Sequence, residues 1–77
     1  MYKSLNSPQN LKLLAWLKQQ RCEQSLTMRD LAERLEVPHS FIGKVEQGER
    51  RLDVVEFIQY CEALNVSPFD GIKAATK

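Results

Sequence analysis

Two short helical segments separated by only three residues constrain the fold of this chain more than any other feature. The first predicted helix covers about residues 27–35, and the second covers about residues 38–47. Pro38 keeps the residue before it out of the helical conformation, and its own ring suits the first position of a new helix. The break at residues 36–38 is therefore a tight turn, and a turn this short brings the two helices into close contact.

The side chains around this turn are the ones that such a contact needs. Where the two helices cross, only a small side chain fits, and Ala32 stands at that position. The apolar spacing around it is kept across residues 28–47, so we predict a rigid helix-turn-helix. The apolar positions that would pack the two helices together are Leu31, Leu35, Val37, Ile42 and Val45.

The rest of the chain also has a helical period, and no alternation typical of a strand persists. Four predicted helices begin at a capping residue, with Pro at the first position in two of them and an acidic residue at N3 in two others. These residues are Ser7 with Pro8, Ser67 with Pro68, Thr27 with Asp30, and Asp53 with Glu56. We predict an all-α fold, a compact bundle of about five helices, at about residues 8–23, 27–35, 38–47, 53–65 and 67–77.

The length of the chain limits the number of domains, and its cysteine content indicates the redox compartment. With 77 residues, the chain forms one domain, 1–77, with a core over about 8–66 and a short C-terminal helix and tail at 67–77. Two cysteines are too few for a disulfide framework, and the stretch after Met1 lacks the apolar region of a secretory signal. We expect a reducing cytosol, no membrane span, and a small core that favours oligomerisation. Trp16 belongs either to this core or to an interface, and the predicted core includes Leu11, Leu14, Cys22, Cys61 and Leu64.

Charge and motif content narrow the class of protein. Eleven Lys and Arg against ten Asp and Glu leave a formal charge of +1, which by itself does not point to nucleic acid. Residues 1–22 contain bases without an acid, and residues 53–70 contain acids without a base, so either two oppositely charged faces or ordinary solvated helices are consistent with the sequence. There is one histidine and no phosphate loop, ligand cluster or nucleophile motif. We expect no enzyme activity, no metal and no cofactor.

Taken together, these features resemble the phage-repressor and Cro type of helix-turn-helix, the XRE family. The matching stretches are residues 27–35, 37–42 and 45–48, and the similarity covers about residues 11–66. The resemblance implies an ion pair between Arg21, at the end of the first helix, and Glu46, at the end of the third.

Three positions depart from the family pattern. The turn usually has a glycine where this chain has Glu36, which costs on the order of 1 kcal/mol if that residue is left-handed. Met28 stands in place of a glutamine that bonds to DNA in the family, so that side-chain contact is lost. Pro38 replaces a Ser or Thr cap.

The resemblance and the helical period together select the residues that would face DNA. A rotation of about 100° per residue turns Ile42 and Val45 inward, and in a helix-turn-helix the second helix lies in the major groove. Free N–H groups at the start of a helix favour phosphate. The predicted base contacts are His39, Ser40, Gly43 and Lys44, and the predicted phosphate contacts are Thr27, Met28, Arg29, Gln47, Arg50 and Arg51.

Some of these residues have a second explanation. Gly43 costs roughly 1 kcal/mol inside a helix, and it allows either a close approach to the groove or tight packing. Phe41 contacts either the edge of the core or a thymine methyl. Arg51 has the alternative of an exposed ion pair with Asp53. An ordinary solvated surface is the alternative for His39, Ser40 and Lys44.

The function that we expect is that of a sequence-specific, DNA-binding transcriptional regulator, such as a repressor. One helix reads only a few base pairs, so we expect a homodimer on a palindromic operator with half-sites about one turn apart. The expected partners are double-stranded DNA and a second copy, joined through Phe69 and Ile72 with Trp16 as a third candidate, and no small-molecule effector. The expected location is the cytoplasm, at the nucleoid, of a bacterium or of a phage host.

Two alternatives remain open at this point. A protein-interaction module could use the same fold without reading DNA, and the weak net charge and Met28 favour it slightly. An antitoxin or a restriction-modification controller is the other alternative. An antitoxin needs a toxin-binding extension, and the six residues after Gly71 argue against a long one.

Overall fold

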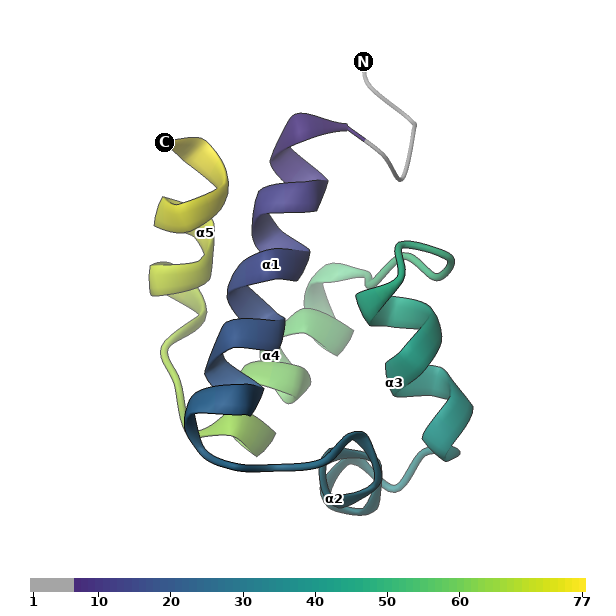
Figure 1. Cartoon of the computed structure of the whole chain (residues 1–77). Helices are drawn as coiled ribbons and strands as arrows, with labels where there is room; N and C mark the ends of the chain where they lie inside the picture. The colour runs from purple at the N-terminus through teal and green to yellow at the C-terminus, as the bar shows by residue number, and fades with distance from the viewer. Residues whose placement is uncertain (1–6) are drawn as a thin grey trace.

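Residues 7–77, which the computed structural model describes, fold into five α-helices (Figure 1). No strand occurs within this stretch, and none of its helices is long and apolar enough to cross a membrane. The predicted all-α, five-helix fold is confirmed, whereas most of the stretch that bears on a secretory signal lies before the described residues. The helices are α1 (Pro8–Glu23), α2 (Met28–Leu35), α3 (His39–Glu46), α4 (Val54–Leu64) and α5 (Pro68–Thr76).

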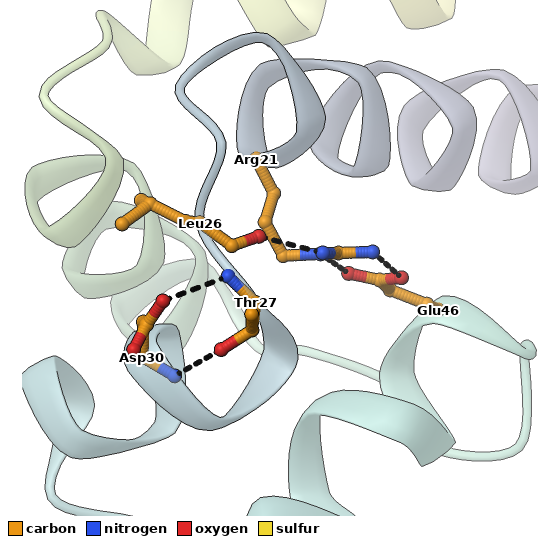
Figure 2. Close-up of polar contacts among 5 residues, drawn as sticks. All are labelled: Arg21, Leu26, Thr27, Asp30 and Glu46. Carbon is orange, nitrogen blue, oxygen red and sulfur yellow. Dashed lines mark hydrogen bonds and ion pairs between the residues drawn. The ribbon is translucent and has the colours of Figure 1, made fainter.

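The helix starts follow from hydrogen bonds between neighbouring residues. At α2, Thr27 Oγ1 accepts a bond from the Asp30 N–H at 3.0 Å, and the Asp30 carboxylate accepts one from the Thr27 N–H at 3.0 Å (Figure 2). Asp53 and Glu56 make the same reciprocal pair at α4, at 2.7 and 2.9 Å. Both capping boxes were predicted, because the bonds depend only on residues three positions apart. At α3, by contrast, Pro38 is the N-cap and makes no side-chain bond.

The turn between α2 and α3 closes without a glycine. Glu36 has φ 57° and ψ 43°, which is the left-handed conformation that the family pattern fills with glycine. The N–H of Glu36 donates to Glu33 O at 3.2 Å, and the N–H of Val37 donates to Ala32 O at 3.0 Å. These two bonds satisfy two of the last four carbonyls of α2, so the turn remains tight despite the backbone strain at Glu36.

The core lies where α1, α2, α3 and α4 meet. Leu17, Leu31, Ile42, Val45 and Leu64 are almost completely buried there. Outside this core, α5 lies alongside α1 (Figure 1). The large hydrophobic residues that remain exposed in the described part of the chain are on α1, α4 and α5.

Two residues predicted for the core were wrong. Leu11 is 50% exposed and Cys22 is exposed as well. Leu14, which was also predicted for the core, is buried, and it forms the buried face of α1 together with Leu17 and Arg21. The period alone did not select this face, because α1 carries apolar residues around much of its circumference.

Helix α5 is part of the packed body of the protein. Gly71 is buried, and a Cβ atom at this position would lie 2.7 Å from Cζ3 of Trp16 and 2.9 Å from Cζ of Phe57. Gly71, which weakens a helix by itself, therefore allows α5 to approach α1 closely. Trp16 is half-buried at this contact and packs against the core.

Candidate nucleic-acid interface

The last turn of α3 is held to α1 by an ion pair with little access to water. Arg21 Nε lies 2.6 Å from Glu46 Oε2, and Nη2 donates to Oε1 at 3.1 Å (Figure 2). The third nitrogen, Nη1, donates to the carbonyl of Leu26 at 2.7 Å. The two side chains are only 11% and 4% exposed, and the hydrogen bond that Arg21 donates to Glu46 raises the pKa of Arg21. This is the pair that the family resemblance implied, and it fixes the end of α3 relative to α1 and to the start of α2.

The middle of α3 contacts the start of α2 without a steric demand for glycine. A Cβ atom at Gly43 would meet only Met28 Sδ, at 4.0 Å, which is an ordinary contact. Tight packing therefore does not explain this glycine. Met28 itself is half-buried and packs against the core, so its side chain offers little surface to a ligand.

The outer face of α3 is polar and open to solvent. Ser40, Lys44 and Gln47 are exposed along it, with His39 at its first turn and half-buried Gly43 among them. The N–H of Phe41 in the first turn of α3 donates to Pro38 O at 2.9 Å, whereas His39 and Ser40 have no side-chain cap for their N–H groups. The surface can thus offer several hydrogen-bond donors and one lysine charge to a flat or grooved partner.

The start of α2 combines exposed donors with a negative charge. Thr27 and Arg29 are exposed there. Thr27 Oγ1 accepts the capping bond from the Asp30 N–H, so the side chain of Thr27 is engaged within the protein. Hydrogen bonds from the backbone and side chain of Thr27 lower the pKa of Asp30, so this carboxylate stays ionised beside the predicted phosphate contacts.

The two arginines after α3 differ in their surroundings. Arg51 is exposed. Arg50 Nη2 lies 2.7 Å from Glu56 Oε2, Nη1 donates to Oε1 at 3.2 Å, and the guanidinium carbon is 4.6 Å from the centre of the Phe41 ring. The side chain of Arg50, which the sequence suggested for phosphate, is therefore bonded within the protein. Phe41 packs against the core, as the first of its two explanations required.

The contact between Arg50 and Glu56 was missed in the sequence, although both residues had been noted for other reasons. Glu56 was recognised as the N3 residue of a capping box, and its carboxylate in fact serves Asp53 and Arg50 together. An arginine six residues before a capping glutamate was the available signal. It is weak, because only the loop geometry decides whether the two side chains meet.

A rigid pair of crossed helices with a polar, unobstructed second helix defines a helix-turn-helix protein. The chain belongs to the helix-turn-helix family, whose characteristic sequence matches residues 17–70. An XRE-family-like protein from Pseudomonas syringae pv. tomato str. DC3000 has a similar structure, with a TM-score of 0.83 and 35% identity over 88% of this chain and 83% of that one.

The clp gene regulator ClgR from Corynebacterium glutamicum is also similar, with a TM-score of 0.77 and 27% identity over 86% of this chain and 87% of that one. A second structure of ClgR has the same TM-score and identity and is covered over 71% of its length. No curated protein matches the chain. Fold and family together are those of a DNA-binding transcription regulator, a class that is typically not enzymatic.

Proposed function

We propose that this protein is a sequence-specific regulator that places α3 in the major groove of its operator and acts as a homodimer. The observation that carries this proposal is the outer face of α3, which is polar, solvent-exposed and free of a side chain at Gly43. A helix with this face can approach the base edges closely, and its orientation is held by the pair between Arg21 and Glu46.

Within this proposal, the exposed residues divide into two roles. Lys44 donates to guanine O6 and N7, and Ser40 and His39 bond to neighbouring base edges, while Gly43 lets the helix backbone come close. Phosphates on either side are bound by the first turn of α2 and by the segment after α3. These phosphate contacts are Thr27, Arg29, Gln47, Arg51 and the backbone of Met28.

The homodimer is supported by where the apolar surface lies. In the described part of the chain, every exposed large hydrophobic residue is on α1, α4 or α5, and none is on α2 or α3. Val54 and Ile72 line one apolar groove of about 400 Å³ between these helices. A second copy of the chain fits this surface best, because a two-fold axis there leaves both α3 helices exposed. The residues are Leu11, Val54, Val55, Ile58, Phe69 and Ile72.

A selection from random duplexes at near-physiological salt tests the proposed reading. We expect a palindromic motif with half-sites about one helical turn apart. Lys44→Ala should change the preferred base in each half-site, whereas Arg51→Ala should weaken all sequences alike and reduce the salt slope by about one. Lys73→Ala, on α5, is the matched control and should change neither. Recovery of no motif, with only weak salt-sensitive binding, would contradict the proposal and favour a protein-interaction module.

Sedimentation equilibrium tests the dimer separately. The double variant Val54→Lys, Ile72→Lys should be monomeric and should lose affinity for the full palindrome while retaining that for a half-site. A wild-type chain that stays monomeric on operator DNA would contradict this part of the proposal.

A further inference from the structure

We propose that Arg50 is a positioning residue, which holds the first turn of α3 at the angle needed to discriminate base sequences. The inference rests on the proposed function, in which α3 reads the major groove. It assigns to Arg50 a role other than the phosphate contact that the sequence suggested.

Arg50 joins three parts of the structure around α3. Its guanidinium makes two bonds to Glu56 at the start of α4 and lies over the ring of Phe41 in the first half of α3. One of its nitrogens also donates to the carbonyl of Arg51. Its backbone N–H donates to Lys44 O at 3.2 Å. The side chain therefore connects α3 to α4 through a planar group that uses both its face and its edge.

Apart from Ile42, which is buried in the core, the first turn of α3 has few other supports. Pro38 provides no side-chain cap. Behind Phe41 there is a small hollow of about 80 Å³, which Val37, Glu56 and Tyr60 also line, so the core does not fully support the ring. At the other end of α3, the pair between Arg21 and Glu46 provides the support that Arg50 gives here.

The consequence for recognition follows from how two kinds of contact depend on geometry. Hydrogen bonds from His39 and Ser40 to base edges weaken steeply when the helix tilts. The attraction between charges and phosphates falls off slowly with distance. A looser first turn should therefore reduce discrimination between sequences more than it reduces binding to DNA in general.

Two conservative variants separate positioning from phosphate binding. Arg50→Lys keeps the charge but loses the fork and the planar face, and Glu56→Gln keeps the capping box of α4 but weakens the bond to Arg50. We expect both to lower the ratio of affinities for the selected operator and for a scrambled duplex of equal length, by about two- to fivefold, the scale of an exposed cation–π contact. Arg34→Lys, whose arginine donates to Ala63 O at 2.8 Å away from α3, is the control and should leave the ratio unchanged.

A phosphate contact predicts the opposite pattern. Arg50→Lys would then bind both duplexes much as the wild type does, and Glu56→Gln would release Arg50 and raise the affinity for both. Either result overturns the proposal.

Hydrogen exchange on the protein alone gives a test that does not need DNA. Arg50→Lys and Glu56→Gln should both speed the exchange of the amides of residues 41–44 while those of α1 keep their wild-type rates. Unchanged exchange in α3 would overturn the positioning role. If the wild type prefers no duplex, the proposed function fails, and the exchange rates still decide what Arg50 does.

Discussion

The two sides of this molecule are held together by different kinds of contact. On the side of α2 and α3, an arginine–carboxylate pair holds the last turn of α3, a second arginine bonds to Glu56 and lies over the Phe41 ring, and the outer surface is polar. On the side of α1, α4 and α5, aromatic rings pack against Gly71, and large apolar side chains remain exposed. Hydrogen bonds and ion pairs are directional and fix the orientation of a helix, whereas apolar contact depends mainly on area. The first side is thus suited to a partner read by hydrogen bonds, and the second to an apolar partner.

The largest expected effect comes from breaking the buried pair on the polar side. Arg21→Met leaves Glu46, which is 4% exposed, without its charge partner, and should destabilise the protein by about 3–5 kcal/mol. The double variant Arg21→Met, Glu46→Leu should recover most of this loss, because no buried charge is then left unpaired. Urea unfolding followed by circular dichroism measures both. A loss in the single variant no larger than about 1 kcal/mol, the scale of a surface pair, would contradict this view of the joint.

Substitution of the two helical glycines, one on each side, compares how tightly the two sides are packed. Gly71→Ala places a methyl group 2.7 Å from the Trp16 ring and should destabilise the protein by about 1–3 kcal/mol. Gly43→Ala meets only Met28 Sδ at 4.0 Å and should instead stabilise α3 by up to about 1 kcal/mol. Thermal unfolding of the two variants measures this difference in sign. The comparison fails if both substitutions change the melting temperature in the same direction. Weaker operator binding by the more stable Gly43→Ala would further support close approach of α3 to the groove.

Acid should weaken one capping box on each side. Backbone bonds from Thr27 and from Asp53 are the main cause of the lowered pKa values of Asp30 and Glu56, whose ordinary values are 3.8 and 4.5. A carboxyl group whose pKa is lower in the folded state than in the unfolded state stabilises the folded state. This stabilisation is complete when the pH is above the unfolded-state pKa, and it is lost as the pH falls through the folded-state pKa. Melting temperatures should therefore drop below about pH 4–5. In the variant Asp30→Asn, Glu56→Gln the melting temperature should be lower at neutral pH and should change less with acid; an acid profile like that of the wild type would contradict the assignment.

The smallest expected effect is a difference in chemical reactivity between the two cysteines, and labelling the exposed one should leave the stability of the protein unchanged. Cys22 is exposed on α1, whereas burial raises the pKa of the Cys61 thiol on α4 to about 11. Iodoacetamide at neutral pH should therefore add one group to the native protein, at Cys22, and a second only after unfolding. Mass spectrometry counts the adducts, and the native Cys22→Ser variant should take none. Rapid labelling of Cys61 in the native protein would show that the core of α4 opens readily.

The sequence was sufficient for the parts of the fold that depend on near neighbours. The starts of α2 and α4 were predicted because Thr27 with Asp30, and Asp53 with Glu56, bond across three positions. Gly48, which follows α3, is left-handed with φ 78°, and a glycine just after a helix is a local feature of the same kind. The buried face of α1 was predicted only in part, because its apolar residues surround the helix. Leu14 is buried as expected, whereas Leu11 is exposed and Leu17 is buried.

For the candidate site, the sequence placed the exposed residues of α3 on one face but did not reveal which neighbouring side chains were already engaged. Arg50, for example, is bonded to Glu56 and stacked on Phe41. The reason is that Arg50 and Phe41 are nine residues apart, and the loop after α3 has to fold back before they meet.

The sequence by itself therefore determined the helices, their caps and the tight turn, since all of these depend on contacts within one or two turns of chain. Only the tertiary structure decided which side of α1 is buried, that Gly71 is needed against Trp16 while Gly43 has room, and that Arg50 supports α3. These outcomes depend on distances between segments that are far apart in the chain, and no local spacing carries that information.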